Sequence, residues 1–178
     1  MVRWWGGVGR RGRIAVLSAV AVALAAWVVL VLVVARGPQS RARQYLAFTA
    51  CLLTDAHGLT GTQAAPAWAG LEDASLATHA KVEYLPVTTG STAAAAAPFL
   101  ASMVARQCKV VVAAGQAQVA AVLADAGHYP DVTFAVVGGA GAARKPREGR
   151  NVTVVGGSPD AVRSAVAGLV TSAVGAAS

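Results

Sequence analysis

An apolar run of 22 residues, Ile14–Ala35, is the feature that most constrains what this chain can fold into. Only Ser18 interrupts it, and the run contains no charged residue. At about 1.5 Å per residue, a helix of this length is about 33 Å long, enough to cross a hydrocarbon core of about 30 Å. We therefore predict a transmembrane helix or signal anchor over 14–35, after a basic segment, 1–13, and before a polar stalk, 36–44.

The positive charge of the chain is concentrated on both sides of this run. Residues 1–43 contain seven arginines and no acid, whereas the rest of the chain carries eight basic and eight acidic residues, so the net charge of +7 flanks the run. Nucleic-acid binding needs basic residues on a face of the folded domain. We therefore expect a membrane, and no nucleic acid, as the partner. The arginines before the run, with Trp4 and Trp5, favour a single-pass protein of the cell membrane with its domain on the extracytoplasmic side.

Two other fates of the N-terminal region are considered. The apolar core of a cleaved signal peptide usually has 7–15 residues and is shorter than this one, but Val33–Ala35 would serve as a small-residue cleavage site, so cleavage stays an alternative. The sequence before Cys51 is faintly lipoprotein-like. However, an acylated cysteine directly follows its apolar segment, and here the charged stretch 36–43 intervenes, so we expect no lipid on Cys51.

The remaining residues, 45–178, alternate between short apolar runs and helical repeats. Such alternation predicts one α/β domain with a doubly wound parallel sheet, for which 2-1-3-4-5 is the natural strand order. The expected strands are 46–54, 81–86, 109–114, 132–137 and 151–155. The expected helices are 63–77, with Trp68, Leu71 and Leu76 on a helical repeat, 93–107, 116–126 and 158–174.

In such a sheet, ligands bind beyond the carboxyl ends of the strands, near the switch point between strands one and three. The candidate ligand-binding residues at this edge are Asp55, His57, Gly58, Gly115, Gln116, Gly138 and Gly139. The glycines are also explained by turn chemistry alone. Asp55 has two interpretations that the sequence leaves open, because its carboxylate could bind a polar ligand or cap the next helix through an Asx turn.

The chain contains no pattern of residues typical of catalysis. Its three histidines are scattered without the spacing of metal ligands, and no glycine-rich segment has the spacing of a phosphate-binding or dinucleotide-binding motif. We therefore expect no enzyme activity, no metal and no cofactor. A small-molecule ligand is compatible with these absences.

The two cysteines lie on strands expected to be neighbours. Cys51 is in the first strand and Cys108 directly precedes the third, and adjacent strands are about 4.8 Å apart. Their Cα atoms could then fall within the 4.4–6.8 Å that a bridge requires, which predicts a Cys51–Cys108 disulfide. An oxidising compartment outside the cytoplasm suits such a bond. Two buried free thiols are the alternative.

Several segments together resemble a known family. Leu52–Gly58, Ala67–Leu71, Lys81–Tyr84, Cys108–Gly115 and Tyr129–Val137 resemble the basic membrane protein (BMP, Med-like) family of substrate-binding lipoproteins. The resemblance implies a lobe of the periplasmic-binding-protein fold, outside the cytoplasm, that delivers purine nucleosides to an ABC permease. It covers the first of the family's two lobes only.

The departures from the family pattern leave two hypotheses. Residues 59–65 lack the aromatic and acidic residues that hold the nucleoside, and Gly138 stands where the family carries an acid. One hypothesis is a membrane-tethered receptor of ABC-transporter type for a nucleoside-like molecule, with a second copy or a partner completing the cleft. The other is a binding-incompetent interaction or structural module that keeps the lobe as a scaffold.

Overall fold

The computed structural model describes residues 23–24, 26–27, 45–138 and 151–177. The chain divides into two units, Met1–Arg43 and Gln44–Ser178, and nearly all described residues belong to the second. Within the described ranges, no helix is both long enough and apolar enough to cross a membrane. Segments 1–13 and 36–44, and most of the predicted span 14–35, lie outside these ranges.

Five parallel strands form a single sheet in the order β2-β1-β3-β4-β5, which confirms the predicted topology. The first strand begins at Thr49, not at Leu46, because the Leu46 N–H donates to the carbonyl of His79 and does not join the strand ladder. The other strand boundaries agree with expectation to within one residue. The strands are β1 (Thr49–Thr54), β2 (Lys81–Pro86), β3 (Cys108–Ala114), β4 (Thr133–Val137) and β5 (Val152–Val155).

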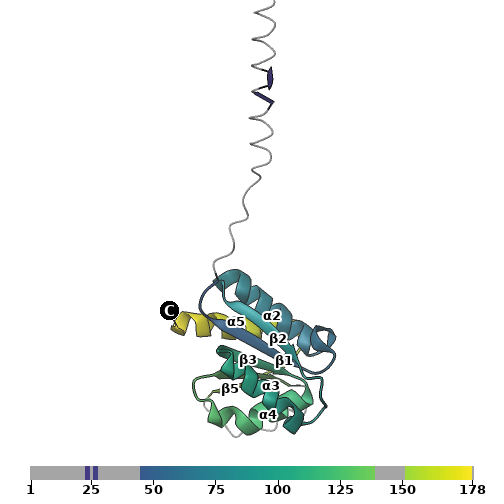
Figure 1. The fold of residues 1–178 in the computed structure, drawn as a ribbon. Helices are drawn as coiled ribbons and strands as arrows, with labels where there is room; N and C mark the ends of the chain where they lie inside the picture. The colour runs from purple at the N-terminus through teal and green to yellow at the C-terminus, as the bar shows by residue number, and fades with distance from the viewer. Residues whose placement is uncertain (1–22, 25, 28–44, 139–150, 178) are drawn as a thin grey trace, which may run out of the picture. The chain divides into compact units, whose positions relative to one another are not determined.

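Helices cover both faces of this sheet, as a doubly wound fold requires (Figure 1). The helices α2 (Ala64–Thr78) and α5 (Pro159–Ala177) pack on one face, whereas α3 (Ala93–Ala105) and α4 (Gln116–Asp125) pack on the other. The start of α5 follows the predicted signals, since the Ser158 hydroxyl accepts the N–H of Ala161 at 3.3 Å.

The core consists of two apolar clusters, one on each face of the sheet. The pairing of α2 with α5 depends on small residues: a Cβ added to Gly70 would lie 2.4 Å from the Arg163 carbonyl oxygen. Of the three residues that the sequence places on a helical repeat in α2, Leu76 does not join the core and is 61% exposed. Five residues separate it from the buried Leu71, and at about 100° per residue this turns Leu76 some 140° away from the core face.

Polar contacts join segments that are distant in the sequence. The guanidinium of Arg163 on α5 donates two hydrogen bonds, of 2.6 and 2.7 Å, to the carboxylate of Asp73 on α2. Just before β5, the side-chain amide of Asn151 donates to the carbonyls of Ala126, Tyr129 and Val132 at 2.9–3.2 Å. Asn151 therefore attaches the turn after α4 to the edge of the sheet.

The structure joins Cys51 to Cys108 by a disulfide with a Cα–Cα distance of 5.9 Å, which is the pairing expected from the sequence. A bulge in the β1–β3 ladder contributes to this distance. Thr49 pairs with Cys108 while Ala50 pairs with Val110, so one extra residue in β3 moves Cys108 one register position closer to Cys51. Both cysteines are buried against the α3–α4 face.

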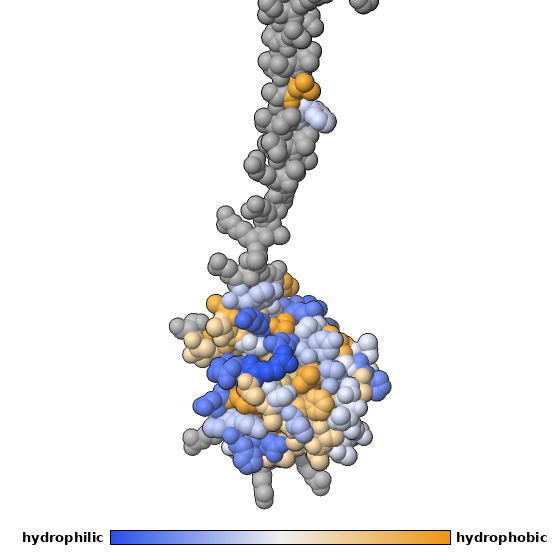
Figure 2. Space-filling model, in the orientation of Figure 1, coloured by the Kyte–Doolittle hydropathy of each residue, from blue (hydrophilic) through white to orange (hydrophobic). Residues whose placement is uncertain are grey.

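The surface of this domain mixes polar and apolar residues. On the visible face, hydrophilic and hydrophobic residues are interspersed (Figure 2). Tyr84, on the edge strand β2, is 46% exposed and makes an edge-on contact with Trp68 of α2, with ring centroids 5.6 Å apart. These two rings lie at the edge of the sheet, on the α2 side.

Candidate functional site

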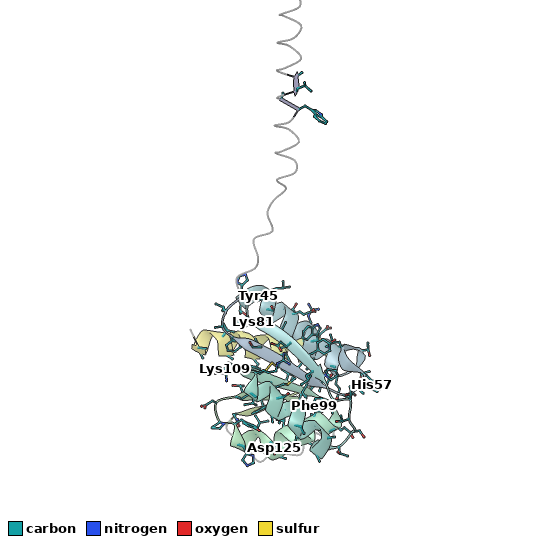
Figure 3. The ribbon with its side chains drawn as sticks, viewed as in Figure 1. Tyr45, His57, Lys81, Phe99, Lys109 and Asp125 are labelled. Carbon is teal, nitrogen blue, oxygen red and sulfur yellow. A yellow bond between two sulfur atoms is a disulfide. The ribbon has the colours of Figure 1, made fainter. Side chains whose placement is uncertain are left out.

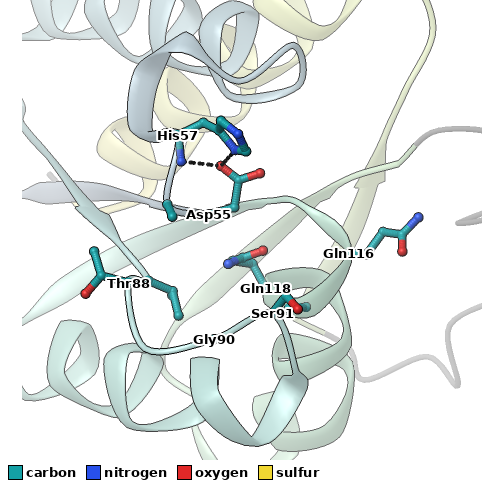
Figure 4. A pocket seen from close by; sticks show the side chains of 10 residues that line it. Asp55, His57, Thr88, Gly90, Ser91, Gln116 and Gln118 are labelled. Carbon is teal, nitrogen blue, oxygen red and sulfur yellow. Dashed lines mark hydrogen bonds and ion pairs between the residues drawn. The ribbon is translucent and has the colours of Figure 1, made fainter.

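A pocket of about 540 Å³ lies at the carboxyl edge of the sheet, where β1, β2 and β3 end side by side. Three segments line it: residues 55–57 after β1, residues 87–91 after β2, and residues 116–118 at the start of α4 (Figure 4). In the order 2-1-3-4-5 this is the switch point, where chain connections leave β1 and β3 toward opposite faces. The pocket is therefore where a doubly wound sheet is expected to hold a ligand.

Asp55 is the one carboxylate among the described residues that line the pocket, and its first oxygen already has a partner. Oδ1 accepts the backbone N–H of His57 at 3.0 Å and lies 3.3 Å from Nδ1 of the same residue. The first contact is the expected Asx turn. The turn does not cap the next helix, because the N-cap residue of α2 is Gln63. The side chain is still 48% exposed, which leaves the carboxylate accessible from the pocket.

The carbonyl oxygen of Thr54, at the end of β1, holds the three lining segments together. It accepts the N–H of Val87 at 2.9 Å and the side-chain amide Nε2 of Gln118 at 3.1 Å. Gln118 is 1% exposed, yet its Oε1 has no hydrogen-bond partner among the described residues. A buried acceptor without a partner is uncommon in native proteins and calls for an explanation.

The first turn of α4 adds unpaired donors to the same place. Gly115, with φ of 116°, is the N-cap residue and has no side chain with which to cap the helix. The first intrahelical N–H bond at this end is that of Val119 to the Gly115 carbonyl. The N–H groups of residues 116–118 therefore have no intrahelical acceptor, and the positive end of the helix dipole lies at the pocket.

The structure brings together some of the residues predicted for this site and not others. Asp55, His57 and Gln116 line the pocket, and Gly115 adjoins it. Gly58 lies outside the lining, in a turn with φ of 59° that faces Tyr84. Gly138 is also outside the lining, because its N–H donates to the Val155 carbonyl between β4 and β5. Gly139 lies outside the described residues.

Sequence reasoning missed two parts of the pocket. The loop after β2, residues 87–91, lines it because β2 lies next to β1 and ends at the same edge. The predicted strand order already implied this, so the signal was present in the sequence. Gln118 carried no such signal, since its burial depends on the packing of α4 against β1 and β3.

Chemically, the described lining of the site offers acceptors and donors and contains no lysine or arginine. Its acceptors are the Asp55 carboxylate and the Gln118 amide oxygen, and its donors are backbone N–H groups. None of the described lining residues is Phe, Tyr or Trp. Within the described part of the chain, no three His, Cys, Asp or Glu side chains are grouped so that they could hold a metal ion. The arrangement is suited to holding a small polar molecule.

The fold and this site define the class of protein: a single doubly wound α/β lobe with a pocket at its switch point. No protein-family model matches the chain, and no curated protein matches it. Among solved structures, the chain is similar to a fragment of a putative lipoprotein from Peptoclostridium difficile 630, with a TM-score of 0.58 and 14% identity over 71% of this chain and 98% of that one. At this identity the likeness shows a shared fold.

Proposed function

We propose that this chain is a membrane-tethered ligand-binding protein whose single lobe resembles the BMP-like substrate-binding proteins of ABC transporters. The observation that carries the proposal is the pocket at the switch point, where Asp55 meets the loop after β2 and the first turn of α4. The similarity in fold to a lipoprotein fits this class. Binding without catalysis is proposed, because the pocket lies at the switch point where doubly wound sheets hold their ligands.

The proposed location is the cell membrane, with the domain on the extracytoplasmic side. The arginine-flanked apolar run of 22 residues supports the anchor, and a buried disulfide suits an oxidising compartment. A fusion of alkaline phosphatase after residue 178 tests this topology, since the enzyme is active only outside the cytoplasm. An active fusion supports the proposal, and an inactive but fully expressed fusion contradicts it.

The proposed partners follow from the shape of the pocket. The described lobe provides one wall, whereas small-molecule sites usually bury 70–90% of their ligand. A second copy of the chain or an ABC permease would supply the other wall. No nucleic acid is proposed as a partner, because the described domain carries no excess of positive charge comparable to that of residues 1–43.

A second candidate is an interaction or structural module that retains the lobe as a scaffold. One observation favours it: among the described residues that line the pocket there is no Phe, Tyr or Trp ring on which a nucleoside base could stack. The resemblance to BMP-like proteins implies nucleosides as ligands, and this lining gives that implication no support. A receptor for a different small molecule and a scaffold are the two functions compatible with the lining.

An unbiased binding experiment separates these two functions. The full chain, purified in a mild detergent, is dialysed against a small-molecule cell extract, and retained compounds are identified by mass spectrometry. The receptor function predicts at least one compound enriched by the wild type and not by the Asp55→Ala variant. If the wild type enriches nothing, the receptor function is wrong and the scaffold becomes the better account.

A further inference from the structure

The pocket contains two hydrogen-bond acceptors that the protein leaves unused. The second carboxylate oxygen of Asp55 has no hydrogen-bond partner in the described ranges, since both contacts with His57 are made through Oδ1. Gln118 is almost wholly buried, and its Oε1 likewise has no partner among the described residues. Figure 4 shows the Gln118 side chain rising from α4 toward Asp55. Both groups require a donor, and a cationic donor is favoured because one of them is a carboxylate.

Gly115 maintains the space between these two acceptors. A Cβ added to Gly115 would lie 2.4 Å from Oε1 of Gln118 and 3.8 Å from Cβ of Asp55. Any side chain at this position would therefore collide with Oε1 of Gln118 at the edge of the pocket, beside Asp55. Because Gly115 has no side chain, the side chains of Asp55 and Gln118 can both lie close to its backbone at the edge of the pocket.

The same place also requires an acceptor from the ligand. The N–H groups of residues 116–118 have no intrahelical partner, and no side chain caps this end of the ten-residue helix α4. Helix N-termini favour a negative group. A carboxylate on the ligand would accept from these N–H groups and so satisfy them.

Acceptors that favour a cation and donors that favour an anion thus adjoin at Gly115. An amine without an acid would leave the helix N–H groups unsatisfied, and an anion without an amine would meet the Asp55 carboxylate. We propose that the pocket binds a zwitterionic ligand of the α-amino-acid class, with its ammonium at Asp55 and Gln118 and its carboxylate at the first turn of α4. This inference rests on the proposed function and specifies the ligand class of the same site.

Isothermal titration calorimetry on the full chain in a mild detergent tests the proposal. The probes are the twenty standard L-amino acids, added one at a time, followed by the amide and the deaminated acid of any that binds. Adenosine and ribose are titrated in parallel. We expect at least one amino acid to bind with a dissociation constant of about 100 µM or lower. Its two analogues, each lacking one charge, should bind at least about tenfold more weakly.

Two variants with the same change of charge assign the binding to this pocket. Asp55→Asn keeps the shape of the side chain and should weaken amino-acid binding at least about tenfold. Asp125→Asn, at the last residue of α4 and about 14 Å along the helix from its first turn, should leave it unchanged. Figure 3 shows Asp125 and His57 at separate parts of the domain.

The outcomes distinguish this inference from the proposed function. Binding of adenosine or ribose that depends on Asp55, without binding of any amino acid, would overturn the amino-acid class and leave the receptor function standing. Amino-acid binding that survives Asp55→Asn unchanged would also overturn the inference. If no probe binds and the dialysis experiment enriches no compound, both proposals are wrong.

Discussion

Removing the Cys51–Cys108 disulfide should destabilise the domain by several kilocalories per mole. The bridge links residues 57 positions apart. In the chain-entropy model, closing a loop of this length removes denatured-state entropy worth about 4 kcal/mol at 25 °C. With a urea dependence of about 2 kcal/mol per M, this loss lowers the unfolding midpoint by about 2 M.

The assay is urea unfolding of a fragment containing residues 44–178, followed by circular dichroism. The oxidised protein is compared with the same protein unfolded, reduced and refolded under a reducing agent, so that the side chains are identical. A Cys51→Ala, Cys108→Ala double variant, unfolded with and without reductant, should show no effect of the reductant. If oxidised and reduced wild type unfold at the same urea concentration, the reasoning from loop entropy is wrong.

Three further changes test the packing and the polar contacts. Gly70→Ala places a Cβ 2.4 Å from a backbone oxygen of α5 and should lower the free energy of unfolding in urea by about 1–3 kcal/mol. Gly168→Ala, which has open space around it, should instead raise this free energy by about 0.5–1 kcal/mol. Equal effects of the two variants would contradict the close contact between α2 and α5. Asn151→Asp replaces a donor that faces three carbonyls with an acceptor and should lower the free energy of unfolding by about 1–3 kcal/mol. Asn151→Ala should lower it less, and the reverse order would contradict the assigned hydrogen bonds. Hydrogen bonds from Arg163 hold the pKa of Asp73 below its usual value, so this pair should stabilise the fold above the unfolded pKa of about 3.9 and lose that effect as the pH falls through the lower, folded pKa. Asp73→Asn should reduce the loss of stability measured by urea unfolding between pH 5 and pH 2, and an unchanged pH profile would contradict the pair's contribution.

Much of the fold could be predicted because each strand has a local pattern in the sequence. Apolar runs bounded by turn residues gave five strands, and right-handed crossovers then gave the order of the sheet, including the neighbouring positions of Cys51 and Cys108. The buried stripe of α2 could not be predicted in the same way. It consists largely of alanine and glycine, whose small size matters only because α5 approaches closely.

The candidate site was predictable to the extent that it follows from topology. Asp55 and Gln116 directly follow β1 and β3, so the strand order alone places them at one edge. Gly138 also follows a strand, but β4 ends farther along the sheet, where it pairs with β5. The burial of Gln118 and the bulge before Val110 depend on tertiary packing, and neither has a local pattern in the sequence.

The central claim is that the three loops around Asp55 bind a small molecule. The most direct test is a nuclear magnetic resonance titration of a fragment containing residues 44–178, labelled with ¹⁵N, with the compound that the wild-type chain retains in dialysis. The account predicts amide shift changes concentrated in residues 55–58, 87–91 and 115–118, and none of comparable size on α5. Shift changes confined to α2 and α5, or no changes at a saturating concentration, would contradict it.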